Sequence, residues 1–278
     1  MDNQRLLVDC VDEPGLVYRI TGVLFRHGCN VIRNQEFVDE ETARFFMRTE
    51  YMGGPPPQVI VDELSGILPR DAEVRVAPST RRRIVLLVTK EHHCLGELLL
   101  KHSFDELGAS ILAVIGNHRR LERLVERFGI PFHHVSHEGL TRPEHEARLA
   151  EALDAYDPEY IVLAKYMRIL SPSFVARYPR RIINIHHSFL PAFVGAQPYR
   201  QAFERGVKII GATAHYVTEV LDEGPIIAQR VIPVDHSYGP EAMAQAGRDV
   251  EKLVLARALR LVLEERVLLL GNRTIVFD

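Results

Sequence analysis

Alternation between apolar strands and amphipathic helices is the feature of this sequence that most constrains its fold. After residue 81 the chain repeats short Val, Ile and Leu runs, such as RIVLLVT, ASILAVIGN and RIINIHH, and segments of helical periodicity separate them. Strands that are apolar along their whole length are typical of a parallel sheet with helices on both faces. The sequence therefore predicts an α/β domain over residues 81–278, in which ligands bind at the carboxyl ends of the strands.

The first 80 residues follow a different pattern. They read as strand, helix, strand, strand, helix and strand, which is the βαββαβ order of a ferredoxin-like domain. Such a sheet has one face covered by two helices and one face open to a ligand or partner. Residues 1–80 carry 8 basic and 13 acidic side chains, whereas the remaining residues carry 26 and 24. The segment Pro78–Thr80 interrupts both patterns, so we place a linker there, between domains 1–80 and 81–278.

Composition argues against several classes of protein. The net charge of -3 disfavours a nucleic-acid partner. The cysteines, Cys10, Cys29 and Cys94, are odd in number and widely spaced, as is typical of a reduced cytoplasmic protein. Charges interrupt the N-terminal segment, and the apolar runs are shorter than the ~20 residues that a membrane-spanning helix needs. We therefore expect a cytoplasmic protein without a signal peptide and with neither a membrane nor a nucleic acid as its partner.

Polar residues at the end of one expected strand are candidates for catalysis. Asn184 and His186 end the strand RIINIHH, and Asp222 lies in a turn between two extended runs. An amide can stabilise an oxyanion, an imidazole can polarise a carbonyl or carry a proton, and a carboxylate can orient the imidazole or activate water. An isolated Asn-x-His more often only caps a strand end, so this spacing alone does not decide the function.

The longer motif around these residues is similar to a known group of enzymes. NIHHSFLPAF, followed by TEVLDEGPII, closely resembles the signature of enzymes that use 10-formyltetrahydrofolate: glycinamide ribonucleotide formyltransferase, methionyl-tRNA formyltransferase and formyltetrahydrofolate deformylase. The resemblance implies catalytic roles for Asn184, His186 and Asp222, and a Rossmann-like sheet of the formyltransferase type. The run KYMRIL resembles the segment that lines the folate pocket in these enzymes. The residues expected to bind the substrate are Met167, Arg168, Leu170, His187 and Ser188.

Three departures from the transferases favour the deformylases. The position of the transferases' glycine-rich phosphate loop reads TKEHHCLG here, so that Glu91, His92 and His93 would obstruct a phosphate. The chain ends shortly after a helical stretch around residues 253–265, which leaves no room for the tRNA-binding domain of methionyl-tRNA formyltransferase. Finally, the His186-His187 doublet resembles the deformylases, because the transferases usually have proline at the second position.

The N-terminal segment agrees with this choice. DEPGLV, followed by Asn30, resembles an ACT domain, a small amino-acid-sensing module, and ACT followed by a formyltransferase-like domain is the order of the deformylases. The resemblance implies an effector such as glycine or methionine, bound between paired domains. It also implies a homo-oligomer, a dimer or a tetramer. The implied effector residues are Asp12, Gly15, Leu16 and Asn30. The competing interpretation is that Gly15 only forms a turn and Asn30 only begins a strand.

Histidines elsewhere in the sequence suggest other sites. His133, His134 and His137 have spacings that could hold zinc, but a strand would point the first two to opposite faces, and neither a cysteine nor a carboxylate completes the set. We therefore expect no metal. His215, in the strand before Asp222, is either a core histidine or a partner of the catalytic residues.

The resemblance implies hydrolysis of 10-formyltetrahydrofolate to tetrahydrofolate and formate, which would supply formate for purine biosynthesis and balance the one-carbon pool. Water would attack the formyl carbon, Asn184 and His186 would hold the oxyanion, and Asp222 would activate the water and support proton delivery to N10. No cofactor is expected, because folate is itself the substrate. One alternative is formyl transfer to an amine acceptor. Another is a non-catalytic sensor of folate and amino acids, which would not require all three catalytic residues.

Overall fold

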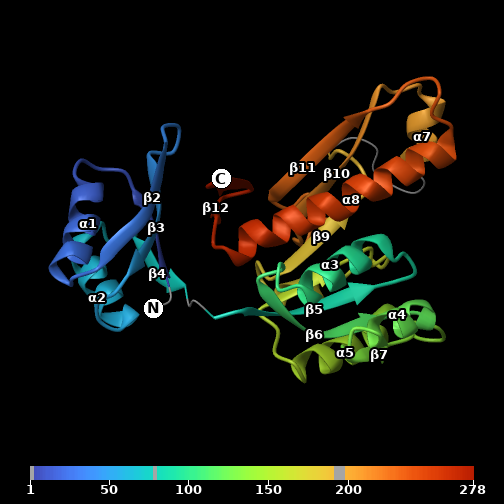
Figure 1. Ribbon diagram of the computed structural model, residues 1–278, viewed down its shortest axis with the longest axis horizontal. Coiled ribbons are helices and arrows are strands. Elements are labelled where there is room, and N and C mark those ends of the chain that lie inside the picture. Colours follow the sequence, from blue (N-terminus) through green and yellow to red (C-terminus); the bar gives the residue numbers. More distant parts are fainter. Residues whose placement is uncertain (1–2, 78–79, 191–197) are drawn as a thin grey trace. The chain divides into compact units, whose positions relative to one another are not determined.

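The computed structural model describes residues 3–77, 80–190 and 198–278, and the chain divides into two compact units (Figure 1). The first unit comprises Met1–Thr80 together with Glu265–Leu268 and Ile275–Asp278, and the second comprises Arg81–Glu264 and Leu269–Thr274. The division by sequence assigns the C-terminal segments to the second domain, whereas in the structure they pack with the first unit. The linker expected at Pro78–Thr80 includes residues 78–79, which lie outside the described residues.

The first unit is built on a four-stranded antiparallel sheet with the order β2-β3-β1-β4. Its elements are β1 (Gln4–Val11), α1 (Leu16–Arg26), β2 (Asn30–Asp39), β3 (Arg44–Met52), α2 (Pro57–Ile67) and β4 (Glu73–Ala77). Apolar side chains from one face of the sheet, such as Val8 and Met47, form a core with Ile20 of α1 and Ile60 of α2. The predicted βαββαβ order is confirmed.

The opposite face of this sheet is partly covered by the chain's own C-terminus. Arg48 alternates with Met47 along β3, so its side chain lies on the face away from the helices, where it is 1% exposed. Its Nε donates a hydrogen bond to the Glu265 carbonyl at 2.8 Å, and Arg75 forms an ion pair with the Glu265 carboxylate at 2.6 Å. The amide of Gln35 donates to the carbonyl of Asp278 at 3.1 Å. This face is therefore less open than the βαββαβ order alone suggests.

The second unit contains a seven-stranded sheet with the order β11-β10-β9-β8-β5-β6-β7. Its strands are β5 (Arg82–Val88), β6 (Ala109–Gly116), β7 (Phe132–His134), β8 (Tyr160–Leu163), β9 (Ile182–His186), β10 (Ile209–Tyr216) and β11 (Ile226–Pro233). The five neighbours β9, β8, β5, β6 and β7 pair in parallel. Strands β10 and β11 extend the sheet beyond β9 and pair antiparallel. The prediction of an α/β, mostly parallel sheet is confirmed.

Helices of the second unit lie against this sheet (Figure 1). They are α3 (His93–Ser103), the 3-10 helix η1 (Arg119–Leu121), α4 (Glu122–Glu126), α5 (Arg142–Asp154), α6 (Pro172–Ala176), α7 (Pro198–Glu204) and α8 (Pro240–Leu263). The short strands β12 (Val267–Leu270) and β13 (Arg273–Val276) pair near the C-terminus. Within the described parts of the chain, no helix is long and apolar enough to cross a membrane.

Helix α8 is longer than the helical stretch expected around residues 253–265. It has 24 residues and packs against β9, β10, β11 and α3. Its first half contains Gly247 and several polar residues, which hide the apolar periodicity from the sequence. A Cβ atom at Gly247 would lie 2.1 Å from the ring of Tyr199, so any larger residue there would force the ring or the helix to shift.

Candidate active site

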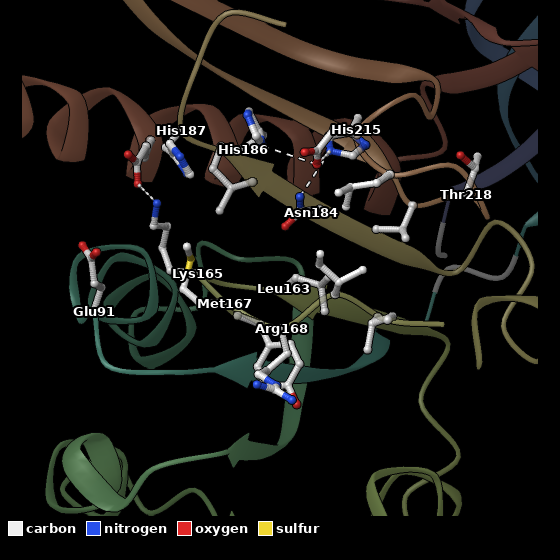
Figure 2. A pocket seen from close by; sticks show the side chains of 18 of the residues that line it. Glu91, Leu163, Lys165, Met167, Arg168, Asn184, His186, His187, His215 and Thr218 are labelled. Atoms are coloured by element: carbon white, nitrogen blue, oxygen red, sulfur yellow. Dashed lines mark hydrogen bonds and ion pairs between the residues drawn. The ribbon is translucent and has the colours of Figure 1, made fainter. Parts of the chain in front are cut away.

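Two neighbouring strands bring the candidate catalytic side chains together. Asn184 and His186 are two residues apart on β9, so they point to the same face of the sheet. The antiparallel register of β9 and β10 places His215 opposite Asn184, and Thr213 opposite His186. Figure 2 shows Asn184, His186 and His215 gathered on one side of the pocket.

Asp222 reaches the same group from the loop between β10 and β11. Its Oδ1 lies 3.3 Å from Nδ1 of His186 and 3.8 Å from Nε2 of His215. The backbone of Asp222 has a φ of 58°, a left-handed conformation that costs free energy outside glycine. At Gly224, an added Cβ would lie 1.8 Å from the carbonyl oxygen of Tyr216. The loop thus approaches β10 too closely for a side chain at residue 224, and this approach holds Asp222 near the histidines.

Hydrogen bonds fix the orientation of His215 and Asn184. His215 Nδ1 lies 2.9 Å from the Tyr216 carbonyl oxygen, to which it donates, so its Nε2 is an acceptor. Asn184 Nδ2 donates to that Nε2 at 3.2 Å. Burial lowers the pKa of His215, and the opposing effects of the Tyr216 hydrogen bond and the Asp222 charge do not reverse the shift. His215 is therefore a direct partner of Asn184 and favours the neutral form.

His186 and Asp222 are in contact at the centre of the polar part of the site. Burial raises the pKa of Asp222, but the hydrogen bond from His186 and the electrostatic interactions with the neighbouring histidines outweigh it and lower the pKa overall. The ring of His187 stacks on that of His186, with centroids 4.8 Å apart. Among the described residues, none hydrogen-bonds the buried Nε2 of His186. A substrate atom that bonded to this nitrogen would recover the free energy that an unpaired buried nitrogen costs.

These residues line a pocket of about 630 Å³, a volume typical of small-molecule sites. The apolar part of its wall comes from the segment after β8 and from the β10–β11 loop. Its apolar side chains include Leu163, Met167, Ile169, Leu170, Val217 and Leu221. A flat aromatic ligand could therefore bind beside a polar centre made of Asn184, His186, His215 and Asp222.

The structure brings most of the predicted substrate residues to this pocket. Met167, Arg168, Leu170 and His187 line it together with the three predicted catalytic residues. Ser188 is buried, and its carbonyl accepts a hydrogen bond from the Thr213 hydroxyl. It is not among the described residues that line the pocket. The end of the NIHHSFLPAF motif, from residue 191, lies outside the described residues.

The predicted effector residues lie in the first unit, in the β1–α1 turn and at the start of β2. Gly15 has a φ of 88° and precedes α1, so this position favours glycine. The side chain of Leu16 packs in the core. The N–H of Asp12 donates to the Ala43 carbonyl at 2.8 Å, and Asn30 is exposed where β2 begins.

Sequence reasoning missed a group of charged and polar residues at the pocket. These are Lys165, Tyr199 and Glu251, which line the pocket beside Glu91, a residue that the sequence indicated only as an obstacle to a phosphate. A lysine two residues after the end of the apolar strand β8 is a signal for Lys165, whose φ of 63° is also left-handed. We find no comparable signal for Glu251, because it lies within a helix among other charged residues.

Comparisons with known proteins decide the family. Residues 82–259 match the formyl transferase family, and residues 4–68 match the ACT domain. The chain is 60% identical over 267 residues to the formyltetrahydrofolate deformylase of Escherichia coli, an alignment that covers 96% of this chain and 95% of that protein. The chain belongs to the formyltetrahydrofolate deformylase family.

Solved structures support the same assignment. A formyltetrahydrofolate deformylase from Pseudomonas syringae pv. tomato matches with a TM-score of 0.96 and 40% identity, over 100% of this chain and 95% of that one. A glycinamide ribonucleotide transformylase from Symbiobacterium toebii matches with a TM-score of 0.67 and 34% identity, over 71% of this chain and 95% of that one. The first unit thus contains the ACT domain of this deformylase family, the second contains its formyl transferase domain, and the chain is a hydrolase.

Proposed function

We propose that the chain hydrolyses 10-formyltetrahydrofolate to tetrahydrofolate and formate, with Asn184, His186 and Asp222 as its catalytic residues. One observation carries the assignment of these residues. His186 and the ionised Asp222 are in contact in the pocket of a deformylase-family chain, with Asn184 beside His186 on the same strand. A hydrolase of a formyl amide needs this combination of a proton carrier, a base and an amide donor.

In the proposed mechanism, water attacks the formyl carbon. The Asn184 amide and the His186 imidazole stabilise the negative charge that develops on the formyl oxygen. Asp222 accepts a proton from the water, and the site delivers a proton to N10 as the bond between the formyl carbon and N10 breaks. The new C–O bond yields formate, and the folate leaves as tetrahydrofolate.

The wall of the pocket fits a folate in size and polarity. Met167 and Ile169 are more than half exposed where the segment after β8 forms the wall, and Leu221 is similarly exposed on the opposing loop. Flat aromatic rings gain free energy by covering such apolar surface. The guanidinium of Arg168 supplies a positive charge for a carboxylate of the substrate.

The proposed hydrolysis implies a metabolic role for the formate and a regulatory role for the ACT domain. Formate released here would supply purine biosynthesis, and the reaction would balance the one-carbon pool. The ACT domain would bind a small amino acid such as glycine or methionine, through Asp12, Gly15 and Asn30, in a homo-oligomer. The left-handed backbone of Gly15 and the exposure of Asn30 are consistent with an effector site at the β1–α1 turn.

Formate release is the decisive measurement. The full chain is incubated with 10-formyltetrahydrofolate, without any amine acceptor, and formate is measured over time. We expect multiple turnovers. A transferase would release formate only slowly and would respond to an added amine, and a folate sensor would bind the substrate without turnover. Either result would contradict the proposed hydrolysis.

A further inference from the structure

A buried ionic cluster forms part of the pocket wall. It consists of His93, Lys165, Tyr199 and Glu251, and we call it the Glu251 cluster. The Glu251 side chain is 1% exposed, and its Oε2 lies 2.7 Å from His93 Nε2 and 3.1 Å from Lys165 Nζ. Its other oxygen, Oε1, accepts a hydrogen bond from the Tyr199 hydroxyl at 2.6 Å. Both oxygens of this carboxylate are therefore used within the protein.

The cluster occupies one side of the catalytic centre. Figure 2 shows Lys165 and Glu91 on one side of Asn184, and Thr218 on the other. Its members come from four parts of the fold: His93 begins α3, Lys165 follows β8, Tyr199 lies on α7 and Glu251 lies on α8. The left-handed backbone of Lys165 costs free energy. The close approach of the Tyr199 ring to Gly247 disfavours any residue with a Cβ atom at that position. Such constraints are common at functional sites.

The charges of the cluster are balanced internally. Burial raises the pKa of the Glu251 carboxyl, but hydrogen bonds from His93 and Tyr199 and the charge of Lys165 outweigh it and lower the pKa to about 2. Glu251 is therefore ionised, and Lys165 supplies the compensating positive charge at 3.1 Å. Removing one member of this buried ion pair would leave an uncompensated buried charge.

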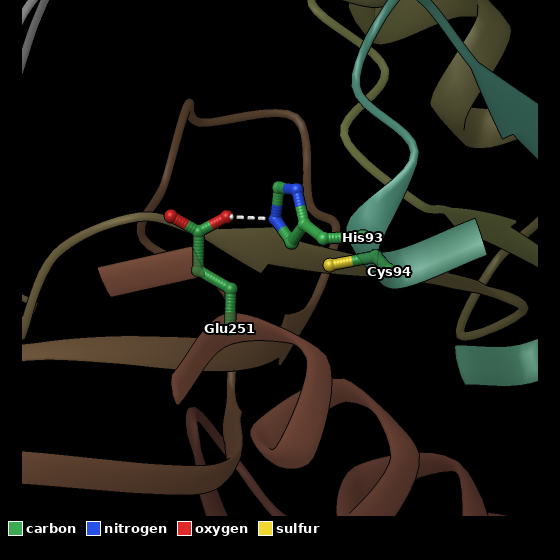
Figure 3. A group of neighbouring side chains, drawn as sticks. All are labelled: His93, Cys94 and Glu251. Atoms are coloured by element: carbon green, nitrogen blue, oxygen red, sulfur yellow. Dashed lines mark hydrogen bonds and ion pairs between the residues drawn. The ribbon is translucent and has the colours of Figure 1, made fainter. Parts of the chain in front are cut away.

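A metal ion is a weaker explanation of the same residues. Donor atoms of His93, Cys94 and Glu251 lie within 4.8 Å of one another (Figure 3). However, burial raises the pKa of the Cys94 thiol well above its usual range, which favours the protonated form over the thiolate that a metal needs. The ammonium group of Lys165 would also repel a cation at Glu251. The donors thus fit an internal ion pair better than a metal site.

We propose that the Glu251 cluster determines the specificity of the reaction by excluding amine acceptors, so that water receives the formyl group. An amine that attacks the formyl carbon needs space beside Asn184 and an acceptor for its N–H groups. Lys165 and Tyr199 form the wall on this side of the pocket, and both oxygens of Glu251 already have partners within the protein. Lys165 presents donors where an amine needs acceptors, and it repels a protonated amine.

This inference rests on the hydrolysis proposed above and concerns the choice of acceptor at the same site. With hydroxylamine as a small probe, the competing reaction is formyl transfer. The bond between the formyl carbon and N10 breaks, a bond from that carbon to the hydroxylamine nitrogen forms, and one proton of that nitrogen passes to N10. The products are tetrahydrofolate and N-hydroxyformamide, which can be measured separately from formate.

The test compares this product ratio between full-length variants. Glu251→Gln weakens the ion pair with Lys165 at nearly constant volume, and Tyr199→Phe frees Glu251 Oε1 to accept from an amine. Glu146→Gln is the matched control, since Glu146 is also buried and accepts from the Ser171 N–H at 2.7 Å, but is not among the described pocket residues. We expect hydroxylamine to leave the unaltered chain and the control producing formate. The ratio of N-hydroxyformamide to formate should rise about tenfold or more in the other two variants.

Each outcome is informative. An unchanged ratio in folded Glu251→Gln and Tyr199→Phe would overturn the inference, as would an equal rise in Glu146→Gln, which would indicate general loosening. If Glu251→Gln does not fold, Tyr199→Phe alone decides the question, because it removes a single hydroxyl. Failure of the proposed hydrolysis would look different from failure of this inference, because the unaltered chain would then release no formate even without hydroxylamine.

Discussion

Asp222 is the residue whose replacement tests the mechanism most directly. It is ionised, it lies 3.3 Å from His186, and the Asp222→Asn substitution preserves its size while removing the base. We expect turnover to fall by about 10²-fold or more, the scale of general acid–base assistance, with folate affinity and melting temperature little changed. Rates of formate release and folate binding should be measured on the same preparation. Near-normal turnover in a folded variant would remove Asp222 from the mechanism.

His215 should make stability depend on pH. Burial lowers its pKa in the folded state, so below its ordinary value of 6.5 protonation favours the unfolded chain. The stability associated with neutral His215 is therefore present above pH 6.5 and is lost as the pH falls below it. The lowered pKa of Asp222 makes stability depend on pH only in a more acidic range, below about 3.8. It therefore does not change the free energy of unfolding between pH 5 and 7.

We accordingly expect the free energy of unfolding to decrease more between pH 7 and pH 5 in the unaltered chain than in His215→Gln. Urea denaturation across this range measures both slopes, and other histidines common to both chains cancel in the difference. Equal slopes would show that the folded protein does not hold His215 neutral.

For individual residues, the sequence was sufficient to predict those that belong to one motif. It did not indicate residues that are distant in the sequence and come into contact only in the folded protein. Asn184, His186 and Asp222 were predicted from one signature, and the structure brings them to one pocket. The hydrogen bond between His93 and Glu251 joins residues 158 positions apart. No local periodicity encodes such a contact, because it depends on how α3 and α8 pack beside the sheet.

Among the elements, α8 shows how a packing requirement can hide a helix from its sequence. Apolar periodicity predicted its second half around residues 253–265, whereas Gly247 interrupts the pattern in the first half. Strands β5, β6 and β9 were located closely, because their apolar runs are short and continuous. The difference arises because a glycine that accommodates Tyr199 lowers helix propensity while it improves tertiary packing.

Replacing Gly247 with alanine should therefore destabilise the protein despite the better helix propensity of alanine. The added Cβ would lie 2.1 Å from the Tyr199 ring, so the ring must move away from Glu251 or the helix must shift. We expect a loss of about 1–3 kcal/mol, the usual cost of overpacking. Gly96→Ala in α3 is the matched control, because its Cβ would meet nothing within 4 Å. Urea denaturation of both variants measures the effect, and a Gly247→Ala chain at least as stable as the control would contradict it.

For the whole molecule, the ACT domain predicts regulation by an amino acid. If Asn30 binds the effector, Asn30→Ala should weaken the response of formate release to glycine or methionine and leave basal hydrolysis unchanged. Coupling between two sites is typically ~1–3 kcal/mol and is reciprocal in binding. Gln58→Ala on α2 serves as a surface control. A response in Asn30→Ala equal to that of the unaltered chain would remove Asn30 from the effector site.

Substitution is a cleaner test of regulation than excision of residues 81–278, because part of that segment packs with the first unit. The order of strands and helices sufficed to predict the sheet of that unit. It could not indicate that Glu265 accepts a hydrogen bond from Arg48, since the two residues are 217 positions apart. When a C-terminal segment packs on the sheet of an N-terminal domain, neither the segment nor the domain carries a periodic sequence pattern that indicates the contact.

This C-terminal addition has a consequence for synthesis on the ribosome. Residues 1–80 emerge before the second unit, yet their folded unit includes Glu265–Leu268 and Ile275–Asp278, which are made after most of it. Domains generally fold as they emerge from the ribosome. Here the domain translated before the second unit can form the bond from Arg48 to the Glu265 carbonyl only after residues 81–264 have been made.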